Sequence, residues 1–330
     1  MIGLFKQKTP VNILVLFISG ILIKLPVFIH PLKPVANSDA AFLYKKLFEF
    51  LDGYSSGTPL LFPVITYLLL FSQSLQLNRL INVNRMMQRT TYLPAVAYLV
   101  TTSLLPEWNI FSPSLIANTF VLLVFNSLFS LYNEQRVKGT VYNIGLCAGV
   151  SSFFFFPALT LFIWVIFGLL VMRPVRVNEW LVCLLGVTTP FYLYAAWLFL
   201  NDQWSWENLI KPVSVSVPHV VQSAWLAGAG LLLVIPFLVG GYYVQDNLRR
   251  MLIQVRKNWS LFLIYLLFAL FVPFLDKNPG SLENWILVVI PFASFHACAY
   301  LYPPRRWFPT IIFWASVLFI LAYQYFGTGW

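Results

Sequence analysis

The sequence predicts an all-α protein, a polytopic bundle of transmembrane helices with about eleven spans. Of its 330 residues, 59% are hydrophobic and only 10% are charged, whereas a soluble domain carries roughly 25% charged residues to keep its surface wet. Long apolar runs recur along the whole chain, and charged residues gather between them. Cations are abundant in every second connection, as the positive-inside rule expects of a chain that crosses a membrane repeatedly.

The apolar runs define the individual spans. A helix needs about 20 mainly apolar residues to cross ~30 Å of hydrocarbon. The predicted spans are 12–29, 58–75, 91–105, 114–132, 142–155, 157–172, 180–200, 223–244, 259–275, 284–302 and 308–325. The segment 142–172 is ambiguous, because Pro157 follows four phenylalanines and is compatible with two short spans or one kinked helix.

The cations set the predicted topology. With the N-terminus inside, most of the 21 Lys and Arg residues fall in inner connections and most of the 11 acids in outer ones. Joining 142–172 into one span would place the cluster from Arg249 to Lys257 outside, against the rule. We therefore predict one integral membrane domain over residues 1–330, with the N-terminus inside, the C-terminus outside and no separate soluble domain. The net charge of +10 is assigned to topology, so no nucleic-acid partner is expected.

The first outer connection, 30–57, predicts an amphipathic helix at the membrane interface, with its apolar side in the lipid. Asp39 or Ser38 is suited to cap it. The apolar positions recur at steps of three and four, and Lys45 and Glu49 form an i, i+4 pair on the other face. These apolar positions are Leu43, Leu47, Phe50 and Leu51.

Asp39 has two interpretations. It is either a helix cap in a plain connector or a catalytic base that faces a groove together with Lys24, His30 and Lys33. A carboxylate beside cations at headgroup depth suits transfer from a polyprenyl phosphate, because the acid takes a proton from the acceptor hydroxyl and a cation stabilises the departing phosphate.

Two ionisable side chains fall within predicted spans. Lys24 is either a functional intramembrane charge or a side chain that snorkels to the nearby interface. His296 is either a hydrogen-bonded core histidine or a proton carrier, and the absence of an intramembrane acid beside it disfavours an ion-coupled pump.

A second outer segment, 201–222, contains Trp204, Trp206 and Glu207. Aromatic faces with a nearby carboxylate suit a sugar ring, but an interfacial aromatic belt has the same composition. Gly145 and Gly149 form a GxxxG spacing, which predicts close helix packing inside this chain in preference to dimerisation. Three distant histidines predict no metal site, and no nucleotide-binding motif predicts a cofactor.

Three stretches carry a family resemblance: Phe5 to Asn12, Leu77 to Pro94, and Arg173 to Trp180. With them the chain resembles an uncharacterised multipass inner-membrane protein family of Bacteroidota, which implies a bacterial inner (cytoplasmic) membrane location. A looser similarity is to GT-C-type glycosyltransferases that use polyprenyl-phosphate sugars. That similarity implies a catalytic acid in the first outer loop, at the position of Asp39, although the paired acidic motif of many such enzymes is absent here.

Two function hypotheses follow. The first is a glycosyltransferase of cell-envelope biogenesis that acts at the outer face, with Asp39 as base. Lys24, His30 or Lys33 would lie at the phosphate of the lipid-linked substrate, and Trp204, Trp206 and Glu207 near the sugar. The second is a non-catalytic membrane scaffold or transporter subunit that works with partner membrane proteins. Membrane lipids are expected partners in both.

Overall fold

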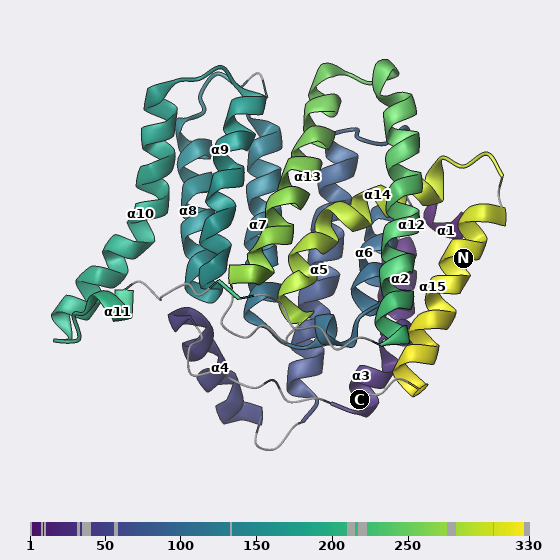
Figure 1. The fold of residues 1–330 in the computed structure, drawn as a ribbon, viewed down its shortest axis with the longest axis horizontal. Coiled ribbons are helices and arrows are strands. Elements are labelled where there is room, and N and C mark those ends of the chain that lie inside the picture. Colours follow the sequence, from purple (N-terminus) through teal and green to yellow (C-terminus); the bar gives the residue numbers. More distant parts are fainter. Residues whose placement is uncertain are drawn as a thin grey trace.

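The structure, a computed structural model, describes residues 2–7, 9, 11–31, 34, 41–55, 59–132, 134–209, 215–216, 223–275, 282–305 and 307–326. Every regular element within these ranges is a helix (Figure 1). The α-helices are α1 (Ile2–Phe5), α2 (Val11–Ile23), α3 (Leu25–Ile29), α4 (Phe42–Ser55), α5 (Leu61–Val83), α6 (Leu93–Ser103), α7 (Pro113–Ser130), α8 (Lys138–Phe154), α9 (Leu161–Met172), α10 (Val177–Leu200), α11 (Trp206–Leu209), α12 (Ala224–Asn247), α13 (Ile253–Phe271), α14 (Val289–Leu301) and α15 (Trp307–Phe326). Short 3-10 helices are η1 (Pro106–Asn109), η2 (Phe156–Thr160), η3 (Leu248–Arg250), η4 (Val272–Leu275) and η5 (Leu282–Val288).

Each of the eleven predicted spans coincides with a helix or a helix pair. The ambiguous segment 142–172 forms two helices, because Phe155 adopts an extended conformation between α8 and the 3-10 turn that leads into α9. The first predicted span is interrupted at Lys24, where α2 ends and α3 begins with Pro26 in its first turn. Proline at such a position starts a helix readily, because its missing N–H is not needed there.

Within the described ranges, six helical segments are long and apolar enough to cross a membrane: 113–130, 177–200, 224–250, 253–275, 282–301 and 307–326. Three shorter apolar segments, 11–23, 93–103 and 156–172, accompany them. This composition and length indicate a helical membrane protein.

The helices alternate between two ends of the bundle. At one end, the connections α5–α6, α7–α8, α9–α10 and α12–α13 lie together (Figure 1). Hydrogen bonds join these connections to one another, from Gln88 to Asn247 and from Arg173 to the carbonyl of Glu134. We call this the basic end, because its connections carry the predicted inner cations. The interfacial helix α4 and the α6–α7 connection lie at the opposite end.

The centre of the bundle is formed by α6 and α14. All residues of α6 are buried, and the segment that contains α14 is the most buried of the six long apolar segments. An aromatic cluster of Phe125, Trp164, Phe262 and Tyr265 joins α7, α9 and α13, with ring centroids 4.5 to 5.0 Å apart for the pairs that involve Phe125. By contrast, α10 and α12 lie at the periphery and bury few residues.

Glycines bring α8 and α10 into backbone contact. A Cβ atom at Gly145 would collide with the carbonyl oxygen of Cys183, and one at Gly149 would lie 2.7 Å from the carbonyl oxygen of Val187. Gly186 of α10 fits in the same way against the carbonyl of Tyr142. The GxxxG prediction is therefore confirmed, since this motif packs within the chain.

The predicted amphipathic helix is present as α4, with a different ion pair. Tyr44 and Phe48 are buried against the bundle, whereas Phe50, which was predicted on the apolar face, is 62% exposed. Glu49 pairs with Lys46 at 3.1 Å, so the predicted partner Lys45 is wrong. The helix docks on the bundle through Tyr44 and Phe48, and Phe50 of the predicted lipid-facing stripe stays on the outside.

Candidate functional site

Lys24 points into the protein interior. Its side chain is 2% exposed, and its ammonium group donates hydrogen bonds to Thr102 Oγ1 at 3.1 Å and to Asn109 Oδ1. The snorkelling interpretation is wrong, because the amine is held between α6 and η1. Neither acceptor is a carboxylate, so this contact joins the start of α3 to α6 and η1 through hydrogen bonds without an ion pair.

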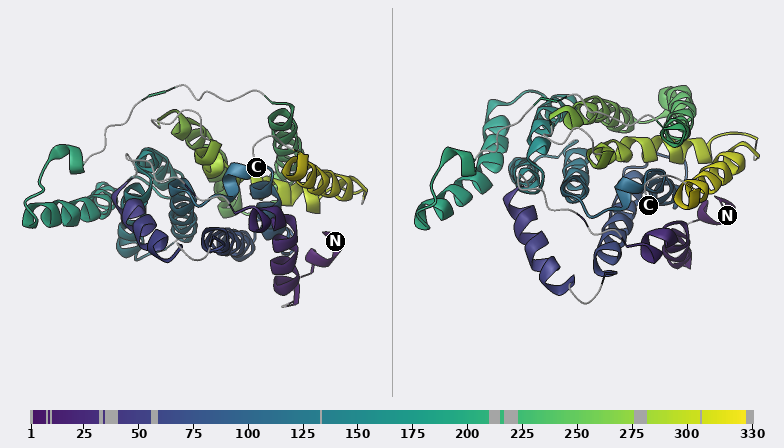
Figure 2. Two further views of the ribbon diagram at one scale, coloured as in Figure 1. Left: turned by 90° about the horizontal axis from the view of Figure 1, so that it is seen from below. Right: turned by 60° about the horizontal axis from the view of Figure 1, so that its bottom comes forward.

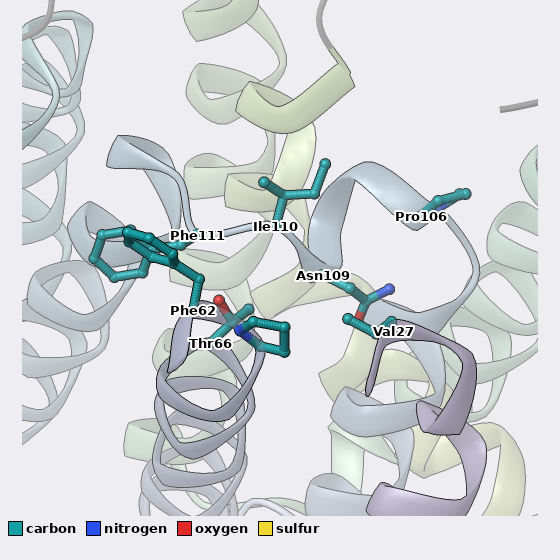
Figure 3. A pocket seen from close by; sticks show the side chains of 8 residues that line it. Val27, Phe62, Thr66, Pro106, Asn109, Ile110 and Phe111 are labelled. Atoms are coloured by element: carbon teal, nitrogen blue, oxygen red, sulfur yellow. The ribbon is translucent and has the colours of Figure 1, made fainter. Parts of the chain in front are cut away.

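A small cavity lies beside this contact. Val27 of α3, Thr66 of α5 and Asn109 of η1 contribute to its wall (Figure 3). The hydroxyl of Thr66 is buried without a hydrogen-bond partner. The cavity measures about 10 Å³, which is room for about one water molecule. A sugar ring does not fit in it.

The other predicted outer-face residues are placed as follows. His30 is exposed and ends α3, with its backbone N–H bonded to the carbonyl of Pro26. Lys33 and Asp39 lie outside the described residues. Trp204 and Trp206 are 46% and 69% exposed and contact each other edge to face with centroids 5.6 Å apart.

The structure does not bring Lys24 and the tryptophan pair together. α3 and α11 lie on opposite sides of the bundle in Figure 1 and in both views of Figure 2. The backbone of Glu207 belongs to α11, and its side chain lies outside the described residues. The described members of the predicted site therefore do not share one pocket.

Tyr44 anchors α4 to the same end of the bundle. Its hydroxyl donates to the carbonyl of Phe111 at 3.0 Å, and its ring lies 5.8 Å from that of Phe111. Burial raises the pKa of Tyr44, and the nearby charge of Glu283 raises it further. Tyr44 is therefore held as a neutral hydrogen-bond donor to the carbonyl of Phe111.

A larger groove opens at the basic end, between the first residues of α8 and α10. It has a volume of about 610 Å³. Three cationic side chains from the two helix starts line it, namely Arg136, Lys138 and Arg176. Gln135, Val137, Gly139, Val177, Asn178 and Glu179 complete the lining. All three cations are exposed.

Both helix N-termini at the groove lack a side-chain cap. Val137 precedes α8 and Arg176 precedes α10, and neither side chain accepts a hydrogen bond from the first turn. The first N–H groups of a helix have no partner within the helix and carry a partial positive charge. Two such termini of long helices, side by side, favour an anion in the groove.

Local sequence explains why α10 begins here. Arg173 precedes Pro174 and is extended, at φ −136° and ψ 155°, as steric contact with a following proline requires. Arg176 is also extended, and the helix starts at Val177. The turn therefore separates α9 from α10 and aims the N-terminus of α10 at the groove.

A nearly buried ion pair neutralises the carboxylate next to the groove. Arg173 contacts both oxygens of Glu179, with Nε–Oε2 and Nη2–Oε1 distances of 3.1 and 3.2 Å. The same guanidinium donates to the carbonyls of Leu131 and Glu134. Arg173 therefore supplies the close contacts to Glu179, while Arg176 of the groove also lies 3.8 Å from Glu179 Oε1 with 63% of its side chain exposed.

His296 is the second of the two ionisable residues that were predicted within spans. It is 2% exposed, and its Nε2 lies 2.8 Å from the carbonyl oxygen of Leu233. The prediction of a hydrogen-bonded core histidine is confirmed. Among the residues that the structure describes, no three His, Cys, Asp or Glu side chains gather as ligands of a metal.

Comparison with protein families gives one match, to a family of unknown function, DUF6427, over residues 41–329. The chain belongs to this family. No curated protein and no solved structure matches the chain. The DUF6427 match carries no activity, and it does not extend to the predicted links with Bacteroidota or with GT-C enzymes.

All groove residues lie inside the DUF6427 match, whereas Lys24, His30, Lys33 and Asp39 precede it. Sequence reasoning missed the groove because it used Arg136, Lys138 and Arg176 only as topology signals. Their grouping depends on the glycine contact of α8 with α10. The signal in the sequence that could have indicated the groove is that two helices with glycines suited to close packing each begin next to cations.

Proposed function

We propose that this DUF6427 protein binds the phosphate of an anionic lipid headgroup in the groove between the N-termini of α8 and α10. The observation that carries the proposal is the convergence of Arg136, Lys138 and Arg176 on two uncapped helix starts. Basic pockets between transmembrane helices at the cytoplasmic side are suited to phosphate-bearing lipid headgroups.

Charge favours a phosphate in this groove. Each cation near an anionic membrane surface is worth about 1 kcal/mol, and uncapped backbone N–H groups add fixed donors aimed at one ligand. Glu179, the carboxylate in the lining, is neutralised by the close contact with Arg173 at 3.1 Å and by a longer one with Arg176 at 3.8 Å. The groove also adjoins α10, whose outer side is apolar and exposed, so that a lipid tail can remain in the hydrocarbon.

The predicted location fits this activity. With the basic end in the cytosol of a bacterium, the groove faces the inner leaflet of the inner membrane, where phospholipids and polyprenyl phosphates both present phosphate groups. A role in cell-envelope biogenesis follows if the ligand is a polyprenyl phosphate. Phosphatidylglycerol carries a phosphodiester, whereas polyprenyl phosphate carries a monoester, so the two sources are separable by experiment.

Binding is tested with the full chain in nanodiscs of zwitterionic lipid. Fluorescent polyprenyl phosphate and fluorescent phosphatidylglycerol are titrated separately, with inorganic phosphate as a competitor. Combined replacement of Arg136, Lys138 and Arg176 by glutamine is expected to weaken binding on the order of 100-fold, since three cations are lost. Preference for one lipid identifies the source of the phosphate.

The matched control removes the same charge from the same end outside the groove. Its three substitutions are Arg249→Gln, Arg250→Gln and Arg256→Gln. If the control weakens binding as much as the groove variant, general surface charge explains the affinity and the proposal is overturned. The proposal is also overturned if the wild-type chain binds the fluorescent lipids no more tightly than an unrelated membrane protein does.

A glycosyltransferase at the outer face is the second candidate. It is supported by α4, which follows residue 39 as the resemblance implies, and by the contact of Lys24 with Asn109 at the same end. Asp39→Asn is expected to abolish transfer from a polyprenyl-phosphate sugar, while Asp202→Asn, at the end of α10, leaves it intact. Unchanged transfer in Asp39→Asn would remove this candidate.

The non-catalytic alternative concerns partner membrane proteins. A scaffold or transporter subunit is expected to co-purify with a partner at fixed stoichiometry in mild detergent. Recovery of the chain alone counts against it. This measurement is independent of the lipid-binding test, because a scaffold can also hold lipid.

A further inference from the structure

α12 and α15 form a wedge that closes at one end of the bundle and opens at the other. At the closed end, Trp225 of α12 stacks on Tyr323 of α15 with centroids 5.4 Å apart and planes 4° apart. Gly228 lies against the ring of Phe319, where an added Cβ would approach to 2.5 Å. Figure 1 shows the two helices diverging from this contact toward the basic end.

A close contact on another helix holds α12 away from α15 at the open end. Gly240 fits against the backbone of Phe295 in α14, so closely that a Cβ atom there would collide with the Phe295 carbonyl. This contact holds α12 against α14, so at this end α12 and the first turns of α15 stay apart. A crevice of about 560 Å³ remains between them.

The lining of this crevice is apolar with a polar rim. Its walls are Leu238, Val239, Tyr242 and Tyr243 of α12, Pro303 and Pro304 of the connection, and Trp307 and Phe308 of α15. Arg305 is the cation of this lining and is exposed. Leu238 and Tyr242 are 61% and 68% exposed, so the crevice is open on the outer side of the bundle, which in a membrane faces lipid.

The apolar walls and the cation at the rim of the crevice suit an amphiphilic ligand. Pockets of roughly 300–1,000 Å³ with mostly apolar and aromatic walls and a few polar groups bind small ligands. Tyrosine and tryptophan favour the headgroup depth of a membrane, and arginine there can meet a phosphate. The crevice therefore has apolar walls toward the hydrocarbon and a cation at the headgroup level.

We propose that the crevice between α12 and α15 binds one acyl chain of an anionic phospholipid, with its net negative headgroup at Arg305. The wedge shape selects a chain, because its sides converge on the Trp225–Tyr323 contact. Charge complementarity selects an anionic headgroup. This site is separate from the groove between α8 and α10 and does not depend on it.

Photo-crosslinking in vesicles tests the site. The full chain is reconstituted with phosphatidylglycerol that carries a diazirine on its acyl chain, and crosslinked peptides are identified by mass spectrometry. Crosslinks to 238–243 and 303–308 are expected to exceed those to Leu263 and Leu267 of α13. Both of these leucines are exposed and report ordinary surrounding lipid.

Two variants separate the acyl and headgroup contacts. Val239→Trp fills the crevice and is expected to lower crosslinking of the crevice peptides to the level of the α13 peptides. Leu263→Trp is expected to leave crosslinking of the crevice peptides unchanged. Arg305→Gln is expected to lower crosslinking by anionic lipid about fivefold, the weight of one cation, with little effect on a phosphatidylcholine probe. Arg305 is exposed, so this variant remains informative if Val239→Trp does not fold.

The proposal is overturned if crevice and α13 peptides crosslink equally, or if Arg305→Gln affects both lipid probes equally. The groove variant that lacks Arg136, Lys138 and Arg176 is expected to leave crevice crosslinking unchanged. The two lipid sites can therefore fail separately.

Discussion

Replacing Gly186 with alanine tests the contact that places the N-termini of α8 and α10 side by side. The added Cβ would collide with the carbonyl of Tyr142 and lie 2.9 Å from the nitrogen of Leu146 and 3.1 Å from the Cα of Gly145. These are backbone atoms, so no rotamer change relieves the contact. Ordinary contact begins near 3.4 Å, and the helices must separate by at least half an ångström.

The energetic consequence is that of an overpacked interface, about 1–3 kcal/mol. A change of 1 kcal/mol shifts the melting temperature by about 2–4 °C in chains of 150–250 residues and less in longer chains. We therefore expect Gly186→Ala to lower the melting temperature by roughly 2–8 °C. Fluorescence-detected size-exclusion chromatography after heating measures this shift in detergent. Lipid-phosphate binding in the groove should weaken as well.

Gly230→Ala is the matched control. Gly230 lies in α12, and nothing lies within 4 Å of a Cβ built there. Alanine lowers the entropy cost of glycine in a helix by about 0.5–1 kcal/mol, so the melting temperature is expected to stay constant or rise. Equal losses in the two variants, or no loss in Gly186→Ala, would refute the backbone-contact explanation.

Three further predictions concern charged residues. Removing either Arg173 or Glu179 leaves the other charge nearly buried and is expected to lower the free energy of unfolding by up to about 3–5 kcal/mol. In a double-mutant cycle, the variant that lacks both side chains should recover part of this loss. Additive losses would contradict the coupling. Glu107 lies in the α6–α7 connection, and burial raises its pKa above 4.5, so stability should fall as pH rises through that raised pKa. Glu107→Gln should abolish this part of the pH dependence in melting curves, and identical pH profiles would exclude it. In a cysteine-free background, Arg249→Cys should react with a thiol reagent only from the cytosol and Asp202→Cys only from outside; the reverse pattern would invert the topology.

Much of the helical fold could be predicted from sequence, because apolar runs and their breaks are local properties. The positive-inside rule already favoured two spans over one in 142–172, and the extended backbone of Phe155 confirms the break between two helices. The role of Lys24 was less accessible. Its partners, Thr102 and Asn109, are far along the chain, so its position beside the interface suggested snorkelling.

The sequence by itself determined the class of this protein and the grouping of its charged connections. Burial of apolar surface in lipid and the separation of charges between two ends depend on composition and order along the chain. Only the tertiary structure decided which cations meet. Gly145 and Gly186 let two backbones touch, and this contact joins Arg136 and Lys138 with Arg176 in one groove. Such convergence depends on distances between remote segments, which composition and periodicity do not contain.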